Sequence, residues 1–569
     1  MIENLRNIAI IAHVDHGKTT LVDQLLQQSG TLDRKSSDTD RIMDSDDQEK
    51  ERGITILSKN TAINWGEYRI NIVDTPGHAD FGGEVERVMS MVDSVLLLVD
   101  AVDGPMPQTR FVTQKAFAKG LNPIVVVNKV DREGARPDWV INEVFDLFDA
   151  LGANEDQLDF PIVYASALNG IAGEDPDALE DDMDSLFKMI VNQVPAPSVD
   201  PDASLQMQVS SLDYDPYVGV LGVGRIKGGQ MKPGQQVAVI NREGEQRNAK
   251  LLEVKGFLGL NRVNVDEANA GDIVCISGIS NLRISDTICS REAPEAMPAL
   301  TVDEPTVSMT FQVNDSPFAG QDGKYVTSRQ IKERLEQELL HNVALRVEQG
   351  DAAEKFTVSG RGELHLAVLI ENMRREGFEL GVSRPEVVQR ENNGAKEEPY
   401  EQVVVDIEEQ HQGSVMEEMG NRRAEMQNMV PDGRGRVRID FIMPARGLIG
   451  FRSQFLTLTQ GSGILTHVFD HWGPVKGGMA EHRHNGAIVS MVKGTTTAYS
   501  LFTLQDRGRL MVGPGAEVYE GMVIGIHARE NDLTVNPTKG KQLTNVRAAG
   551  TDLDAGQAQG VAQRDQVGR

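Results

Sequence analysis

The chain has 569 residues, and its 57 Lys and Arg against 85 Asp and Glu give a formal net charge of −28. Two cysteines exclude a disulfide framework, and the apolar runs fall far short of the roughly 20 residues that a membrane helix needs. We therefore expect a cytoplasmic protein of about four domains, at roughly 150 residues for each domain.

The acidic residues are unevenly distributed along the chain. Residues 1–387 hold 37 basic and 63 acidic residues, a net charge of −26, whereas residues 388–569 hold 20 and 22, a net charge of −2. A strongly negative surface repels polyanions such as nucleic acid. This argument against a nucleic-acid partner therefore applies to the first two-thirds of the chain only.

Residues 1–198 alternate short apolar runs with stretches of helix length. The runs IAIIAHV, RINIVD, SVLLLVD, PIVVVN and PIVYAS are typical of buried strands, and their spacing predicts an α/β domain with a mainly parallel sheet. After the proline-rich linker PAPSVDP, residues 199–300 predict a small β-barrel from short strands and glycine-rich turns. Cys275 and Cys289 are expected there as small buried apolar residues.

Two α+β domains are predicted next. In residues 301–387 the expected order is strand 306–313, helix 328–341, strand 343–348, strand 355–359, helix 363–375 and strand 378–382, which is the ferredoxin-like pattern. Residues 388–478 fit the same pattern, from the strand EQVVVDI to the strand ILTHVFDHW. Residues 479–569 predict a glycine-rich, strand-like C-terminal domain with a disordered end.

A group of histidines in this region resembles a metal site at first sight. His467 and His471 stand four residues apart, near Glu481, His482 and His484. We expect no metal there, because the first two lie on a predicted strand, where this spacing does not bring them together as on a helix. Cysteine ligands are also missing from the group.

The first apolar run leads into AHVDHGKTT, residues 12–20. This segment fits the phosphate loop G-x-x-x-x-G-K-[ST], except that Ala12 stands where the first glycine belongs. Backbone N–H groups of such a loop bind phosphate oxygens. Lys18 would neutralise the β- and γ-phosphates, and the Thr19 hydroxyl would ligate Mg²⁺.

Two further motifs follow later strands. The segment DTPG offers the Asp74 carboxylate to the Mg²⁺ shell and the Gly77 N–H to the γ-phosphate. The segment NKVD starts at Asn128 and ends in Asp131, whose carboxylate can accept hydrogen bonds from both N1–H and the amino group of guanine. Adenine lacks this pair of donors, so the motif predicts GTP rather than ATP.

A third motif, Ser166-Ala167-Leu168, follows the next strand, where a backbone N–H can reach guanine O6. Open α/β sheets bind ligands at the C-terminal ends of their strands, where these motifs lie. Two more residues bear on hydrolysis. Thr55, in the segment RGITI, would complete Mg²⁺ coordination when the γ-phosphate is present, and His78, directly after DTPG, would orient the attacking water.

The segments AHVDHGKTT, RGITI, DTPGHADF, NKVD and SAL, in this order, resemble the translational GTPases, the superfamily of elongation factors G and Tu. Later segments resemble the ribosome-associated BipA (TypA) family within it: GPMPQTRFV, SRPEVV, EEQHQGSVM, PARGLIGFRSQF and LQDRGRL. The likeness covers residues 1–552. Members similar to elongation factor G also carry alanine at the position of Ala12.

The resemblance implies a P-loop GTPase domain, a β-barrel, two ferredoxin-like domains and a family-specific C-terminal domain. It implies GTP as substrate and Mg²⁺ as metal, bound by Thr19 and Thr55 with Asp74 in the outer shell. His78 would be the catalytic residue, behind a hydrophobic gate of Val14 and Ile54. The implied nucleotide-binding residues are Asp15, His16, Gly17, Lys18, Thr19, Thr20, Gly77, Asn128, Lys129, Val130, Asp131, Ser166, Ala167 and Leu168.

The implied partners are the 70S ribosome or its 50S subunit, 23S rRNA including the sarcin–ricin loop, and the A-site tRNA. The protein would be a monomer that binds no membrane and acts in stress-conditional translation or 50S assembly. Beyond Gly550-Thr551-Asp552 the chain departs from the family pattern, so its C-terminal domain is expected to be truncated or altered at the end. Two alternatives are a regulatory GTPase that acts through a protein partner away from the ribosome, and a factor that delivers aminoacyl-tRNA.

Residues 422–452 hold seven arginines and three acidic residues. One interpretation is a solvated face whose arginines stack on their neighbours. The other is contact with RNA phosphates, to which arginine donates paired hydrogen bonds. The resemblance favours RNA.

Overall fold

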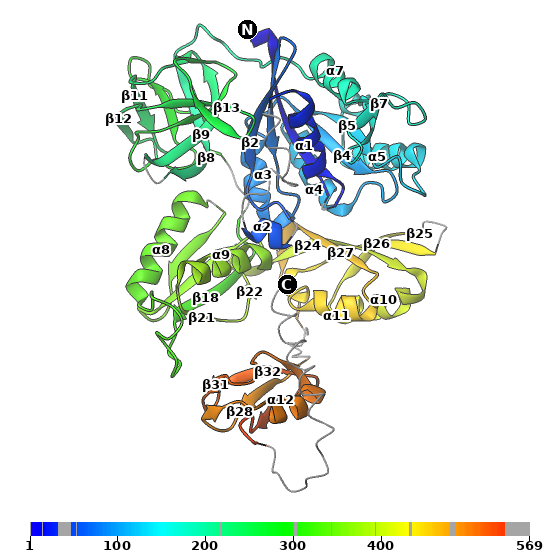
Figure 1. The fold of residues 1–569 in the computed structure, drawn as a ribbon, viewed down its shortest axis with the longest axis vertical. Coiled ribbons are helices and arrows are strands. Elements are labelled where there is room, and N and C mark those ends of the chain that lie inside the picture. Colours follow the sequence, from blue (N-terminus) through cyan, green and yellow to red (C-terminus); the bar gives the residue numbers. More distant parts are fainter. Residues whose placement is uncertain are drawn as a thin grey trace. The chain divides into compact units, whose positions relative to one another are not determined.

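The computed structural model describes residues 2–13, 15–31, 47–52, 54–215, 218–300, 304–342, 344–392, 394–431, 435–477 and 485–540 (Figure 1). The described residues up to 476, apart from 315–318, form one compact unit, and residues 315–318 form a second with the described residues from 477 to 540. None of the helices in the described ranges has the length and apolar character needed to cross a bilayer.

The first part of the chain folds around a seven-stranded sheet in the order β2-β3-β1-β4-β5-β6-β7. The five strands predicted from apolar runs pair in parallel, and β2 and β7 are antiparallel at the two edges. The strands are β1 (Leu5–Ala12), β2 (Lys59–Trp65), β3 (Tyr68–Asp74), β4 (Ser94–Asp100), β5 (Asn122–Asn128), β6 (Ile162–Ser166) and β7 (Ile171–Gly173).

Helices cover both faces of this sheet because neighbouring side chains on a strand point to opposite sides. Ile11 and Leu97 pack on the face covered by α3, α4 and α5, whereas Ile10 and Leu98 pack on the face covered by α1 and α7. The helices are α1 (Lys18–Gln28), α2 (Asp47–Arg52), α3 (Gly82–Val88), α4 (Pro107–Ala118), α5 (Pro137–Ala150), α6 (Glu155–Leu158) and α7 (Asp184–Gln193), with the short 3-10 turns η1 (Ile2–Asn4) and η2 (Ala79–Phe81).

The edge strand β2 is not among the strands that the sequence analysis predicted. It lies between the phosphate loop and Asp74, and its own fully buried apolar residues are Ala62 and Ile63. A tight turn with Gly66 in a left-handed conformation joins it to β3, and the antiparallel ladder continues from the turn. Strand pairing, rather than apolar content, stabilises this segment as a strand.

The barrel domain forms an eight-stranded antiparallel sheet in the order β12-β11-β17-β8-β9-β16-β13-β14, with β10 and β15 paired separately. Cys275 and Cys289 are free and buried, as predicted, and burial raises the pKa of the Cys275 thiol to about 11. The strands are β8 (Gln206–Asp215), β9 (Gly219–Gly228), β10 (Gln230–Met231), β11 (Gln236–Ile240), β12 (Gln246–Lys250), β13 (Val254–Leu258), β14 (Asn261–Asn264), β15 (Ala268–Asn269), β16 (Ile273–Ile276) and β17 (Thr287–Ser290).

The first ferredoxin-like domain has the predicted element order, and its sheet runs β19-β20-β18-β21 with β22 also paired to β18. Thr327 and Gln330 form a capping box at the start of α8, and Ile331 and Leu335 of that helix are fully buried. The elements are β18 (Val307–Val313), α8 (Ser328–His341), β19 (Arg346–Gln349), β20 (Lys355–Gly360), α9 (Glu363–Glu376), β21 (Leu380–Val382) and β22 (Glu386–Val387).

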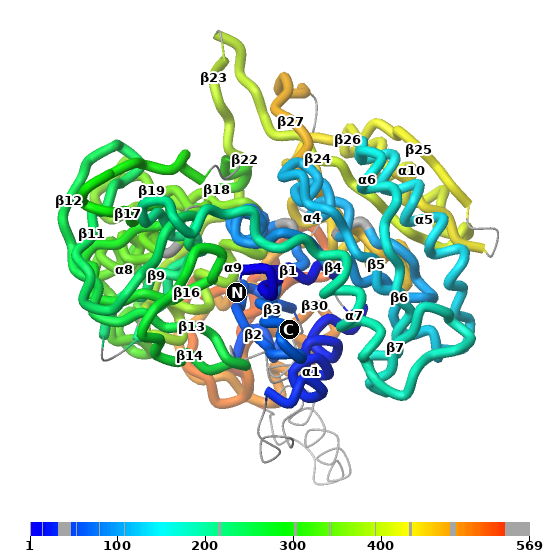
Figure 2. Tube along the Cα trace, turned by 90° about the horizontal axis from the view of Figure 1, so that it is seen from above, coloured from blue at the N-terminus to red at the C-terminus, as the bar shows by residue number. Residues whose placement is uncertain are grey.

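The second ferredoxin-like domain repeats this order, with β27 and β26 on either side of the long strand β24. In Figure 2, β23 and the beginning of β24 project away from the neighbouring elements. The elements are β23 (Arg390–Asn392), β24 (Ala395–Glu408), η3 (Glu409–His411), α10 (Gln412–Asn421), β25 (Glu425–Pro431), β26 (Arg436–Pro444), η4 (Ala445–Gly447), α11 (Phe451–Leu458) and β27 (Ile464–Pro474).

The second compact unit contains a four-stranded sheet in the order β30-β32-β28-β33 and the pair β29-β31. Sequence analysis predicted strands here and missed the helix α12, which Thr497 caps by accepting from the Ser500 N–H. Residues 541–569, including the predicted altered end, lie outside the described residues. The elements are β28 (Ala487–Ser490), β29 (Gly494–Thr495), α12 (Ala498–Leu504), η5 (Gln505–Arg507), β30 (Gly508–Leu510), β31 (Glu517–Val518), β32 (Val523–His527) and β33 (Leu533–Val535).

The histidines of β27 bind carboxylates. His467 Nδ1 lies 2.5 Å from Glu401 on β24, and His471 Nδ1 lies 2.6 Å from Asp470. Burial by itself would lower the pKa of His467, but Glu401 raises it, and the resulting value is about 9. Asp80 of the first domain also acts to raise it.

This pair predicts a pH-dependent contribution to stability. The folded pKa of His467 lies above the ordinary value of about 6.5, so its stabilisation is complete below that pH and is lost as the pH rises through about 9. We expect His467→Gln to lower the unfolding temperature at about pH 6 and to have little effect at about pH 10. His471→Gln, on the exposed part of the same strand, is the control, and an effect of His467→Gln that is equal at both pH values would contradict the prediction.

Candidate nucleotide site

The phosphate loop connects β1 to α1 and depends on one glycine. Gly17 has φ +93°, and a Cβ atom there would lie 2.6 Å from Nδ2 of Asn128. Ala12, in contrast, is the last residue of β1 and pairs with Leu98 in the parallel ladder. The extended backbone there tolerates a side chain, which explains why alanine replaces the first glycine of the motif.

The predicted residues line a cavity of about 320 Å³ at the C-terminal ends of β1, β3, β5 and β6. The predicted site residues that line this cavity are Asp15, Gly17, Lys18, Thr19, Thr20, Thr55, Gly77, His78, Asn128, Lys129, Asp131, Ser166, Ala167 and Leu168. Ala12, His13, Ile54 and Arg132 complete it. Five segments that are far apart in the sequence therefore meet at one site.

Lys18 lies at the phosphate end of the cavity. Its Nζ atom is 2.9 Å from Oδ1 of Asp74 and donates to the carbonyl of Thr75. Gly77 lines the same end, and a Cβ atom there would lie 2.9 Å from the carbonyl oxygen of Ala12. The loop after β3 therefore passes against the phosphate loop with room for backbone only.

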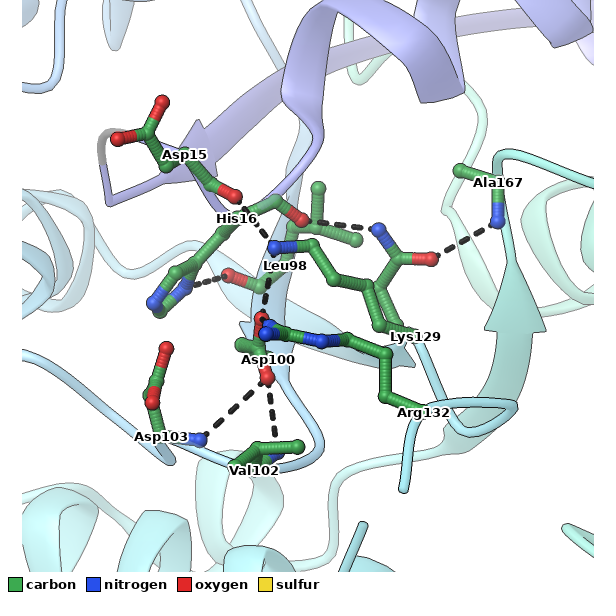
Figure 3. Close-up of polar contacts among 10 residues, drawn as sticks. Asp15, His16, Leu98, Asp100, Val102, Asp103, Lys129, Arg132 and Ala167 are labelled. Carbon is green, nitrogen blue, oxygen red and sulfur yellow. Dashed lines mark hydrogen bonds and ion pairs between the residues drawn. The ribbon is translucent and has the colours of Figure 1, made fainter. Parts of the chain in front are cut away.

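At the base end, two neighbouring side chains join three loops. Asn128 donates to the His16 carbonyl at 2.8 Å and accepts from the Ala167 N–H at 2.9 Å. Lys129, at φ +63°, donates to the Asp15 carbonyl at 2.6 Å and lies 2.8 Å from the Asp100 carboxylate (Figure 3). Both side chains therefore support the shape of the site.

Asp131 is exposed to solvent, whereas Asn128 is buried. Its side chain is exposed and lines the cavity, and one carboxylate oxygen accepts from Asn169 at 3.3 Å. The carboxylate thus remains accessible to a base at this end.

The segment around Thr55 is ordered by a buried carboxylate of α2. Glu49 is fully buried, and its Oε1 atom accepts from the N–H groups of Ile56 at 2.9 Å and Leu57 at 3.1 Å. These two hydrogen bonds fix the segment that contains Ile54 and Thr55, which line the cavity together with His78. Val14 and Gly53, the other predicted parts of this region, lie outside the described residues.

Four parts of the chain each match a model of a known protein family. They are the elongation factor Tu GTP binding domain over residues 3–196, elongation factor Tu domain 2 over 219–289, the elongation factor G C-terminus over 395–483 and the TypA/BipA C-terminal domain over 485–562.

Curated relatives match along nearly the whole chain. The large ribosomal subunit assembly factor BipA of Escherichia coli (strain K12) is 66% identical over 552 residues, which cover 97% of this chain and 91% of the relative. The protein of the same name from Haemophilus influenzae is 65% identical, with 97% and 90% covered. The chain belongs to the BipA (TypA) family. It is therefore a translational GTPase, which hydrolyses GTP with Mg²⁺ as the metal.

A crystal structure of a Thermus thermophilus protein has the same fold over most of the chain. The TM-score is 0.58, at 17% sequence identity, with 84% of this chain and 98% of the other covered. Together with the family models, this confirms the predicted combination of a P-loop domain, a β-barrel, ferredoxin-like domains and a family-specific C-terminal domain.

The donor set fits GTP and Mg²⁺. Backbone N–H groups and the Lys18 ammonium stand at one end, where hydroxyl groups of Thr19 and Thr55 offer the oxygen ligands that Mg²⁺ prefers. Asp74 does not line the cavity, and it pairs with Lys18, which does. This location fits the outer-shell position implied for Asp74.

Two further predicted residues, His16 and Val130, do not line the cavity. The His16 imidazole lies beneath the loop, 3.4 Å from the Leu98 carbonyl, and only its backbone belongs to the phosphate loop (Figure 3). Burial and the neighbouring His13 lower the pKa of His16 to about 3, so the ring is neutral. Val130 packs against the apolar core, and any role in nucleotide binding is limited to its backbone.

Asp100 is a residue of the site that the sequence analysis missed. It ends β4, is fully buried, and binds Lys129 together with the Val102 N–H at 2.8 Å. Burial would raise the pKa of Asp100, but these two donors help to hold it below its ordinary value. An aspartate directly after the apolar run SVLLLV, in register with Asn128 on β5, is the signal that could have identified it.

The arginine-rich segment is largely engaged within the protein. Arg422 binds Gln454, Arg436 binds Asp406, Arg438 donates to the Pro105 carbonyl, and Arg446 binds Glu398. Arg452 is exposed, and Arg434 lies outside the described residues. For the four bound arginines the contacts favour the interpretation of arginines that bind their neighbours, against the predicted RNA contact.

Asp100→Asn tests the anchor of Lys129. The amide keeps the shape of the side chain but loses the charge, and hydrogen bonds to charged groups contribute about 1.5–3 kcal/mol. We expect GTP and GDP to bind roughly 10- to 100-fold more weakly, measured by titration with a fluorescent nucleotide. Asp103→Asn, three residues further on and exposed, is the matched control, and nucleotide affinity that Asp100→Asn leaves unchanged would contradict the assignment.

Proposed function

We propose that the chain is a ribosome-dependent GTPase that acts on the large ribosomal subunit. The observation that carries the proposal is the composition of the cavity wall near the γ-phosphate position. His78 and Ile54 line it, and among the described lining residues the one arginine, Arg132, stands at the base end beside Asp100. A GTPase without an arginine near the γ-phosphate needs a partner to reach fast turnover.

The names of the relatives support the large subunit as this partner. Proteins 66% and 65% identical to the chain are named large ribosomal subunit assembly factors. Within this proposal, 50S assembly is the favoured role, and stress-conditional translation is a second setting for the same reaction. Docking would involve the sarcin–ricin loop of 23S rRNA near His78 and the A-site tRNA near the C-terminal domain, with the protein bound as a monomer.

The proposed roles of the site residues follow from their positions. Backbone groups from Asp15 to Thr20, with Lys18, bind the phosphates, and Gly77 meets the γ-phosphate. Thr19 and Thr55 bind Mg²⁺, with Asp74 behind them. The residues proposed to form the guanine pocket are Asn128, Lys129, Asp131, Ser166, Ala167 and Leu168, with Val130 through its backbone alone. Asp131 selects guanine by accepting from its N1–H and amino groups. His78 orients the attacking water.

The proposal predicts which particles stimulate hydrolysis. We expect 70S ribosomes and 50S subunits to raise the turnover of GTP, and 30S subunits to leave it at the slow intrinsic rate. The measurement is phosphate release at a fixed protein concentration and increasing particle concentration. Turnover that no ribosomal particle stimulates would instead support a regulatory switch with a protein partner.

His78→Ala tests the proposed catalytic residue. Positioned general acid–base groups typically contribute 10²- to 10⁴-fold, so we expect stimulated turnover to fall roughly 100-fold or more. GTP affinity and co-sedimentation with 50S subunits should remain as in the unmodified protein. His471→Ala removes a histidine outside the site as the control, and a loss of nucleotide affinity in His78→Ala would contradict the role assigned here.

A further inference from the structure

Asp80 stands between the proposed catalytic histidine and the first ferredoxin-like domain. It is 5% exposed, and its Oδ1 atom lies 3.4 Å from Nδ1 of His78. The Asp80 backbone nitrogen lies 3.2 Å from the same imidazole nitrogen, which accepts from the Asp80 N–H when it has no proton and faces the carboxylate as a donor when it has one. The backbone and the carboxylate of Asp80 therefore both face Nδ1 of His78.

The second carboxylate oxygen of Asp80 is held by helix α9. Oδ2 accepts from the backbone N–H of Leu364 at 2.9 Å, across 284 positions of the chain. α9 has 14 residues and begins at Glu363, so Leu364 lies in its first turn. The N-terminus of a helix carries unpaired N–H groups and a partial positive charge, which stabilise a carboxylate at this point.

Gly362, which precedes α9, leaves the space that Asp80 occupies. A Cβ atom on Gly362 would collide with Cγ of Asp80 and with both of its carboxylate oxygens. The φ angle of Gly362 is −174°, an extended backbone that any residue adopts. Glycine is required here by the close approach of Asp80 and not by the backbone conformation.

The charges around Asp80 favour its ionised form. Burial by itself would raise the pKa of Asp80, but the imidazole of His78 and the Leu364 N–H help to outweigh it, and the pKa lies well below its ordinary value. His467 of the second ferredoxin-like domain acts in the same direction. Asp80 is therefore an anion to which three domains contribute neighbours.

An apolar cluster keeps the same elements together. Ile56 and Phe81 pack against Val368 of α9, with Ile54 and Leu364 at the edge of the cluster. Ile54 follows the described end of α2, and Phe81 is next to Asp80. A shift of α9 would thus be transmitted to both segments that flank the γ-phosphate end of the site.

We propose that Asp80 is a positioning residue that couples the first turn of α9 to the orientation of the His78 imidazole. Leu364 of the first ferredoxin-like domain donates to the Asp80 carboxylate, and this carboxylate contacts the His78 imidazole. The position of that domain therefore sets the orientation of the imidazole. This inference rests on the proposed catalytic role of His78.

The test is a double-variant cycle of Gly362→Ala and Asp80→Ala. The methyl group of Gly362→Ala meets the carboxylate and displaces it, and Asp80→Ala removes the carboxylate. We expect each change to lower kcat of ribosome-stimulated hydrolysis roughly 10- to 100-fold, the loss typical of a misplaced catalytic group, with unchanged KM for GTP. Because the methyl has nothing to displace once the carboxylate is gone, the double variant should match Asp80→Ala.

A direct readout of the ring separates this coupling from a general loss of structure. In protein labelled at histidine ¹³Cε1, the His78 resonance is assigned by its absence in His78→Gln. We expect Gly362→Ala to shift that resonance although the substitution lies in another domain. Gly420→Ala is the matched control, because it lies in α10 and a Cβ atom there meets nothing within 4 Å.

The outcomes distinguish the two proposals. Loss of turnover in His78→Ala, together with a normal resonance and normal kcat in Gly362→Ala, would overturn the coupling alone. Additive losses in the double variant would also overturn it. Full turnover in His78→Ala would overturn the catalytic role of His78 and with it the inference.

Discussion

The bridge that Asn128 and Lys129 make between loops is the interaction on which the nucleotide site depends. Asn128 joins the phosphate loop to the loop after β6, and Lys129 joins it to Asp100 at the end of β4. These donors and acceptors lie at or just after the C-terminal ends of neighbouring parallel strands, so the register of those strands sets their distances and the shape of the cavity.

A second constraint acts at the opposite end of the site. The segments that contain Thr55 and His78 are held from outside the GTPase domain, since Phe81 and Asp80 contact α9. On α2, Glu49 orders the Thr55 segment, and its neighbour Gln48 donates to Asn372 at 2.6 Å. The phosphate end is thus built jointly by two domains, whereas the base end is built by the GTPase domain alone. This division suits an enzyme that binds nucleotide by itself and adjusts hydrolysis through the placement of its other domains.

The contacts of three arginines bear on the uneven distribution of charge along the chain. Arg436 and Arg446, in the near-neutral last third, bind carboxylates of their own domain. Arg438 donates to Pro105 and so attaches that domain to the acidic GTPase domain. Interdomain contact, in addition to any RNA contact, accounts for arginine in this segment.

The sequence by itself determined the GTPase motifs, the five parallel strands and the order of both ferredoxin-like domains, because these depend on local patterns: apolar runs, glycine positions and short motifs. It did not determine the edge strand β2, where apolar residues are few and pairing with β3 provides the stability, or the seven-residue helix α12, which Thr497 caps. Only the tertiary structure decided that Asp100 supports Lys129 and that Gly362 leaves room for Asp80. These are contacts between residues distant in the chain, and their energy depends on distances that no local pattern encodes.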